Sequence, residues 1–139
     1  MRTLSVHQPW ASLIIAGKKR FEVRSWQTSH RGRLAIHATG RFPPTAHRIC
    51  QREPYRSLLL QIGCEDWGSL PRGVVLGTAE LVDCTRVEDM LWVPEQECLL
   101  SEFQPGSWVW EFADPLPLAC PIPLTGRLGV FESPLPIPA

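Results

Sequence analysis

Short apolar or alternating stretches recur along the chain, and they predict β-strands. These stretches cover residues 3–6, 21–26, 34–38, 107–112 and 128–131. Residues 74–82 are instead apolar at both odd and even positions, which is typical of a central strand with both faces buried. Gly77 within this strand allows the tight bend of a small closed sheet. The sequence therefore predicts five or six short strands arranged around residues 74–82.

One early stretch has the spacing of a helix. Pro9 suits the first position of a helix, and Gly17 is placed as a C-terminal stop. Between them, Trp10, Leu13 and Ile14 follow the i, i+3, i+4 spacing of one helical face. We expect a helix of about two turns here.

The other segments are interrupted by proline. Residues 45–63 have helical composition, but Pro54 divides them into two helical pieces. Residues 63–71 are expected to form a loop, and residues 88–102 a loop that could include a helical turn. The proline-rich residues 115–123 are predicted to run extended along a sheet edge. Together these elements predict a mixed α+β fold, a small β-barrel or half-barrel with one or two flanking helices.

The alternation within residues 21–26 separates two faces of the predicted strand. Phe21 and Val23 are expected to face the core, while Glu22, Arg24 and Trp26 share the opposite face. A polar pair formed by Glu22 and Arg24 would then line a pocket or face solvent.

Composition places the chain among ordinary globular proteins. The 139 residues are 44% hydrophobic and 20% charged, which predicts one compact domain over residues 1–139 and excludes a disordered chain. No stretch predicts a membrane span or a secretory leader, so a cytoplasmic location is expected. The five cysteines are odd in number and lack ligand spacing, which predicts reduced, mostly buried thiols and no metal site. Phosphate-binding glycine loops are absent, and no cofactor is expected.

The net charge of zero conceals a strong asymmetry. Residues 1–56 hold 11 Lys and Arg against two acids, whereas residues 57–139 hold three Arg against 12 acids. If the fold keeps the halves apart, the basic half predicts an anionic partner. If the halves interleave in space, they neutralise each other.

The densest polar cluster lies between the predicted helix and the strand that follows. Lys18, Lys19 and Arg20 are consecutive, and their mutual repulsion is relieved only by solvent or an anion. In a regular strand Lys19 would point to the same face as Phe21. Its side chain could therefore reach the pocket beside Glu22 and Arg24 only by entering from the turn. The competing interpretation is a solvated basic edge strand that discourages aggregation.

This cluster also carries a family signature. Residues 17–24 read Gly-x-Lys-x-x-Glu-x-Arg, which resembles the G-x-K-x-x-E-x-R signature of the ASCH (activating signal cointegrator-1 homology) family. Further similar segments are residues 4–11, 24–26, 30–34, 73–77 and 110–112. The resemblance is specific through about residue 40, patchy to residue 84 and weak after it.

The resemblance implies a PUA-like barrel with a cleft between the barrel and the first helix, and it implies a nucleic-acid partner. Family members are proposed to bind RNA or other nucleic acid, and a nucleotide-like small ligand is a related expectation. Lys19 and Arg24 would contact phosphate or a base edge, and Glu22 would orient Arg24 or accept a hydrogen bond from a base. Four further residues are expected to line the cleft, namely His7, Gln8, Trp10 and Trp26.

Physical chemistry favours the same interpretation. Binding of single-stranded RNA needs a cationic track and aromatic platforms on which bases stack. The cations of this track would be Arg20, Arg24, Arg31 and Arg33. Core packing is the competing interpretation for Trp10 and Trp108, so Trp26, at a strand end, is the better stacking candidate.

A hydrolase is the main alternative. Some small ASCH proteins hydrolyse the amide of N4-acetylcytidine with the signature Lys, a Thr three residues later and a distal Glu. Lys19 fits this pattern, but Glu22 occupies the Thr position, so Lys19 and Glu22 would be catalytic only in a changed mechanism. Glu80 or Glu111 could supply the distal carboxylate.

Two other functions stay open. A ribonuclease would use a histidine pair, His7 with His37 or His30, for acid and base catalysis. A protein-interaction module would dock a protein partner through the acidic half, from Glu65 onward, or through the proline-rich tail.

Overall fold

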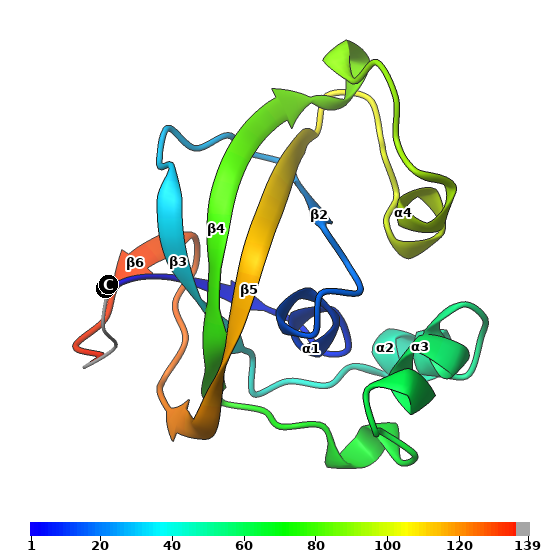
Figure 1. The fold of residues 1–139 in the computed structure, drawn as a ribbon, viewed down its shortest axis with the longest axis vertical. Helices are drawn as coiled ribbons and strands as arrows, with labels where there is room; N and C mark the ends of the chain where they lie inside the picture. Colours follow the sequence, from blue (N-terminus) through cyan, green and yellow to red (C-terminus); the bar gives the residue numbers. More distant parts are fainter. Residues whose placement is uncertain (136–139) are drawn as a thin grey trace.

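The computed structural model describes residues 1–135, which form one curled six-stranded sheet with helices beside it (Figure 1). The strands are β1 (Arg2–Val6), β2 (Phe21–Arg24), β3 (Gly32–Ala38), β4 (Val74–Arg86), β5 (Trp108–Pro123) and β6 (Val130–Glu132). The helices are α1 (Trp10–Ile15), α2 (Pro44–Cys50), α3 (Tyr55–Gln61) and α4 (Glu95–Leu100), with 3-10 turns at Trp67–Ser69 and Val87–Asp89. The predicted domain span of residues 1–139 ends beyond the described residues.

The sheet is a half-barrel, which is one of the two forms that the sequence predicted, and it is not the closed barrel that was the other. Its strand order is β2-β5-β4-β3-β1-β6, and only β1 and β3 pair in parallel. Strands β2 and β6 are the two edges, so hydrogen bonding does not close the ring within the described residues. Four α-helices accompany the sheet there, where one or two were expected.

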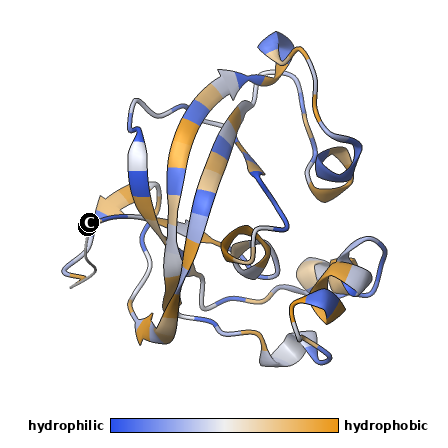
Figure 2. Cartoon of the chain, in the orientation of Figure 1, coloured by the Kyte–Doolittle hydropathy of each residue, from blue (hydrophilic) through white to orange (hydrophobic). Residues whose placement is uncertain are grey.

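Strong curvature in β4 and β5 shapes the half-barrel. Register shifts interrupt their pairing at three points, and bulges of this kind increase local bend and twist. A Cβ at Gly77 would collide with the Leu116 backbone, so only glycine fits where β5 crosses β4 so closely. The predicted bend at Gly77 is confirmed. Figure 2 shows hydrophobic and hydrophilic bands alternating along both strands.

Glu22 and Arg24 share one face of β2 and line a pocket, as predicted, but this face lies on the core side of the sheet rather than opposite the core. Phe21 is buried as expected, but Val23 is half-buried and borders a cleft. Glu22 pairs in register with Trp110, and directly paired residues point to the same face of a sheet. Trp110 belongs to the main apolar core, so Glu22 and Arg24 lie on the core side of β2, at the open edge of the half-barrel.

The helices follow the sequence pattern closely. Helix α1 ends before Gly17, whose positive φ of 78° is the left-handed conformation of a helix stop. Helix α2 ends at Cys50 and α3 begins after Pro54, so the predicted division at that proline is confirmed. The helical turn within residues 88–102 is α4. A second apolar cluster joins α1, α3 and α4 through Leu13, Leu59 and Leu100.

The cysteine prediction is correct for oxidation state and wrong for burial. All five thiols are free, but Cys50 alone is buried, while Cys98 and Cys120 are exposed. Cys98 lies on the outer side of a helix of only six residues, and Cys120 lies in the part of β5 that extends beyond its pairing with β2. Among residues 1–135 no helix is long and apolar enough to cross a membrane.

Candidate functional site

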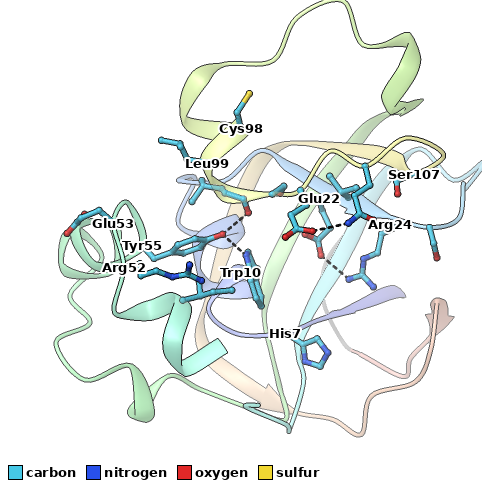
Figure 3. Close-up of a pocket in the computed structure, with 17 residues that line it drawn as sticks. His7, Trp10, Glu22, Arg24, Arg52, Glu53, Tyr55, Cys98, Leu99 and Ser107 are labelled. Atoms are coloured by element: carbon cyan, nitrogen blue, oxygen red, sulfur yellow. Dashed lines mark hydrogen bonds and ion pairs between the residues drawn. The ribbon is translucent and has the colours of Figure 1, made fainter. Parts of the chain in front are cut away.

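A cleft of about 810 Å³ opens where the helices meet the open edge of the half-barrel (Figure 3). Glu22 and Arg24 contribute from β2, and His7 and Trp10 from the start of α1. One side wall comes from α2, α3 and their connection, and the other from α4 and the segment that follows it. The volume is within the usual range of ligand pockets, about 300–1,000 Å³.

Lys19 lies beneath the cleft rather than in its lining. Its side chain is fully buried, and Nζ donates to the Phe21 carbonyl and, over 2.6 Å, to Ser101 Oγ. Glu22 Oε1 lies 3.5 Å from the same Nζ. The ammonium thus donates two hydrogen bonds and forms an ion pair with Glu22. Lys19 therefore fixes the turn against the segment after α4 and neutralises Glu22 from below.

Glu22 and Arg24 form the polar floor of the cleft. Arg24 Nη2 lies 3.1 Å from Glu22 Oε2 and donates to the Ser5 carbonyl over 2.8 Å. Arg24 therefore spans the open edge of the half-barrel from β2 to β1. Its Nε is buried and has no hydrogen-bond partner among the described residues. The side chains of Glu22 and Arg24 keep 14% and 23% of their surface exposed, so a ligand in the cleft can reach both.

An aromatic pair connects the floor to both side walls. Trp10 Nε1 donates to the Tyr55 hydroxyl over 2.9 Å, and the two rings meet edge to face. The Tyr55 hydroxyl in turn donates to the Leu100 carbonyl over 2.7 Å. Burial raises the pKa of Tyr55 to about 12, so the hydroxyl stays protonated near neutral pH. Nearby, exposed His7 shares a 2.8 Å hydrogen bond with the Thr39 hydroxyl.

Two residues expected in the cleft lie elsewhere. Gln8 is fully buried, and its amide bonds to Ser12 and to the Pro71 carbonyl, which leaves no group free for a ligand. Trp26 packs edge to face on Trp110, with 4.6 Å between ring centroids. Both residues make these contacts within the protein, and neither lines the cleft.

The predicted cationic track does not continue along β3. Arg31 is paired with Asp83 at 3.9 Å, and Arg33 with Glu80 at 3.5 Å. Arg20, also expected in the track, is paired with Glu111 at 2.8 Å. In each pair a cation of the basic half meets an acid of the acidic half. Across the sheet, therefore, the two halves interleave.

The residues of the enzymatic alternatives do not all meet in one pocket. Lys19 and Glu111 line a separate small pocket, Glu22 lines the cleft, and Glu80 lines neither. His37 lies in a separate pocket, between Ser5 Oγ at 3.0 Å and the Leu124 carbonyl at 2.7 Å, and burial lowers its pKa. His30 contacts the Arg33 carbonyl. In residues 1–135 no group of three or more potential metal ligands gathers.

The sequence analysis missed three residues that build the site. The buried Glu97 carboxylate accepts hydrogen bonds from the backbone N–H groups of Arg20 and Phe21, all near 3.1 Å. Ser101 holds Lys19, and Tyr55 joins the walls. Tyr55 had a local signal, as an aromatic residue on the apolar face of a predicted helix. Glu97 and Ser101 had none, because their partners are about 80 residues away.

Comparison with known proteins identifies the family. The sequence model of the ASCH domain matches residues 4–121. The chain belongs to the ASCH domain family. Activating signal cointegrator 1 from Mus musculus is 37% identical over 129 residues, and the Homo sapiens protein is 36% identical. These alignments cover 93% of this ASCH domain but only 22% of either cointegrator.

Solved structures agree on the fold. The crystal structure of ASCH from Zymomonas mobilis has a TM-score of 0.50 at 18% identity, covering 88% of this ASCH domain and 73% of that chain. A crystal structure of a serine-to-alanine mutant of the same Zymomonas mobilis protein gives the same values. The predicted family is thus confirmed, and the half-barrel agrees with a PUA-like architecture.

Proposed function

We propose that this ASCH domain binds RNA or another single-stranded nucleic acid by accepting an unpaired base in the cleft over Glu22 and Arg24. A base edge presents hydrogen-bond donors and acceptors side by side. Glu22 supplies acceptors, and Arg24 Nε is a donor without a partner among the described residues. The juxtaposition of a carboxylate and a guanidinium with one unpartnered nitrogen, on two side chains that line the cleft, is the observation that carries the proposal.

The surroundings of this pair favour a base over a simple anion. Glu22 would repel a phosphate placed directly on the floor, whereas the amino group of a base would be attracted. Half-buried Trp10 offers an aromatic edge, and exposed His7 is a further polar group at the cleft. Single strands can deliver a splayed base to such a cleft, because their bases are not held in a duplex.

The hydrolase alternative has less support from the geometry. A lysine that acts as base or nucleophile needs a free lone pair directed at its substrate. Lys19 instead directs its hydrogens to Phe21, Ser101 and Glu22 beneath the floor. Turnover of an acylated nucleoside, abolished by Glu22→Gln, would overturn the binding proposal in favour of the enzyme.

The test is fluorescence anisotropy of a labelled single-stranded RNA with wild type, Arg24→Gln and Arg127→Gln. Arg24→Gln should weaken binding by at least about five-fold, because a specific arginine contact to a base is worth about 1–3 kcal/mol. Arg127 is exposed and has no ion pair among the described residues, so its variant controls for lost charge. Equal weakening by both variants, or no binding by wild type, would contradict the proposal.

A further inference from the structure

Exposed arginines without ion pairs gather on the lobe formed by α2, α3 and the loops beside them. They are Arg41, Arg48, Arg52, Arg56 and Arg72, called the lobe arginines below. None of them forms an ion pair within the part of the chain that the structure describes. Glu53 is the single acid between residues 41 and 64. The lobe therefore carries positive charge that the protein itself does not neutralise.

The cations of the sheet behave differently. Arg2, Arg20, Arg31 and Arg33 each lie within 4.0 Å of a carboxylate. Their charges are already compensated, so a polyanion would gain less by approaching them. Ion pairs between the basic and acidic halves of the chain neutralise these arginines of the sheet, but they do not extend to the lobe arginines.

The lobe arginines begin at the cleft itself. Arg52 lines the cleft beside Tyr55, and Figure 3 places it on the α3 side. Arg48, Arg52 and Arg56 are spaced four residues apart, and the Arg56 N–H donates to the Arg52 carbonyl as in a helical turn. Arg48 lies in α2, Arg52 in the connection and Arg56 in α3, so the three cations follow one another along the α2–α3 segment. The charge is thus arranged as a track that leads away from the cleft.

An aromatic surface lies within the same lobe. Phe42 and exposed His47 stack with ring centroids 4.2 Å apart and 19° between their planes. The Arg72 guanidinium lies 5.8 Å from the Phe42 centroid. Cations interleaved with aromatic rings are the combination that binds single strands without base preference.

The opposite wall of the cleft has the reverse charge. From residue 87 to residue 126 the chain contains no Lys or Arg, and α4 and its flanks carry Glu95, Glu97 and Glu102. In Figure 1, α2 and α3 lie together and α4 lies apart from them. A negatively charged backbone leaving the cleft is repelled on the α4 side and attracted on the α2–α3 side.

We propose that the lobe arginines bind the sugar-phosphate backbone of the single strand whose base occupies the cleft. This inference rests on the proposed function and extends it, because it assigns a second contact region and a direction to the bound strand. It also replaces the track expected from Arg31 and Arg33. Arg52 is the junction, since it belongs to both the cleft lining and the lobe.

The experiment measures the salt dependence of binding to a labelled oligouridine of about 12 nucleotides, long enough to extend beyond the cleft. The lobe variant is Arg48→Gln/Arg56→Gln, which leaves every cleft residue in place. Losing two phosphate contacts should reduce the slope of log K against log salt by about 1.4 and weaken binding on the order of ten-fold at low salt. Arg48→Lys/Arg56→Lys should restore most of the affinity, because both charges return.

The matched control is Arg2→Gln/Arg127→Gln, which removes the same charge outside the cleft lining and the lobe. It should change affinity by less than about two-fold, since exposed distant charges are screened. Equal loss in both double variants would overturn the inference, because net charge alone would then explain the binding. An unchanged slope in the lobe variant would also overturn it.

Failure of the two proposals can be told apart. If Arg24→Gln abolishes binding while the lobe variant binds like wild type, the cleft proposal stands and the lobe inference falls. If the lobe variant loses binding while Arg24→Gln does not, the lobe inference stands and the cleft proposal falls. If wild type binds no oligonucleotide, both fall.

Discussion

The two side walls of the cleft are attached to the molecule by different forces. The α3 wall is held mainly by apolar packing, in which Leu58 and Leu59 join the cluster around Leu13, and its Tyr55 hydroxyl adds hydrogen bonds to other parts of the cleft than the signature turn. The α4 wall contributes Leu100 to this cluster, but polar bonds also hold it to the signature turn. Glu97 accepts from the turn backbone, and Ser101 accepts from Lys19.

The difference has a consequence for the cleft. Apolar packing is non-directional, so the α3 wall tolerates small adjustments without losing its position. Buried polar bonds are directional, and leaving one partner unsatisfied costs more than the bond contributes. The position of the α4 wall therefore depends on the turn formed by Lys19, Arg20 and Phe21, whereas the α3 wall does not bond to this turn.

The largest expected effect comes from Lys19→Met. Removing the ammonium leaves the Phe21 carbonyl, Ser101 and Glu22 without their shared donor, and breaking a buried pair of this kind costs about 3 kcal/mol. The free energy of unfolding in urea should fall by that amount. Amide hydrogen exchange should also rise in α4 more than in α3, because only the α4 wall is held through Lys19.

The neighbouring lysine supplies the control. Lys18 is partly exposed and forms no ion pair within residues 1–135. Lys18→Met should change stability by less than about 0.5 kcal/mol. If both variants lost the same stability, or if exchange in α3 and α4 rose equally, the α4 wall would not depend on Lys19.

A smaller effect is expected from Tyr55→Phe, which keeps the ring in the apolar cluster and removes the hydroxyl. The Trp10 donor and the Leu100 carbonyl lose their common partner, which should cost about 1–2 kcal/mol. Urea unfolding measures the loss. No loss at all would mean that the hydroxyl does not connect the two walls.

The loss of stability caused by Tyr55→Phe should depend on pH, because the hydroxyl that the substitution removes titrates. Tyr55 titrates near pH 12 in the folded chain and near pH 10 when unfolded, so the unfolded state releases its proton first. Its stabilising contribution is complete below pH 10 and disappears as the pH rises toward 12. The stability difference between wild type and Tyr55→Phe should shrink over that interval. Tyr55 is the one tyrosine of the chain, so tyrosinate absorbance follows it directly.

The fold was predictable wherever local pattern determines structure. Helix α1 with its stop at Gly17, the break at Pro54 and the bend at Gly77 each follow from residues close in sequence. Closure of the sheet was not predictable, because it depends on which edges meet across the whole chain. The alternation of β2 predicted that Glu22 lines a pocket, but not that its face lies on the core side, which depends on pairing with Trp110.

The site was predictable only in part. The signature placed Glu22 and Arg24 together, and the structure brings His7 and Trp10 beside them. Gln8 and Trp26 show the limit, because neighbours distant in sequence recruit them into internal hydrogen bonds and packing. Similarly, Asp83 and Glu80 neutralise Arg31 and Arg33, and their proximity follows only from β3–β4 pairing and the turn before it.

The smallest expected effect is a difference in alkylation rate between one cysteine in each side wall of the cleft. This measurement needs no substitution in either wall. Cys50 is the buried last residue of α2, and burial raises its pKa to about 11, so its reactive thiolate is scarce at neutral pH. Cys98 is exposed on α4 and lines the cleft. Alkylation followed by mass spectrometry should modify Cys98 at least about ten-fold faster than Cys50. Bound RNA should slow the alkylation of Cys98. Cys120, which is exposed and outside the cleft lining, should be alkylated as before. Equal protection of both thiols would indicate that RNA coats the surface nonspecifically rather than occupying the cleft.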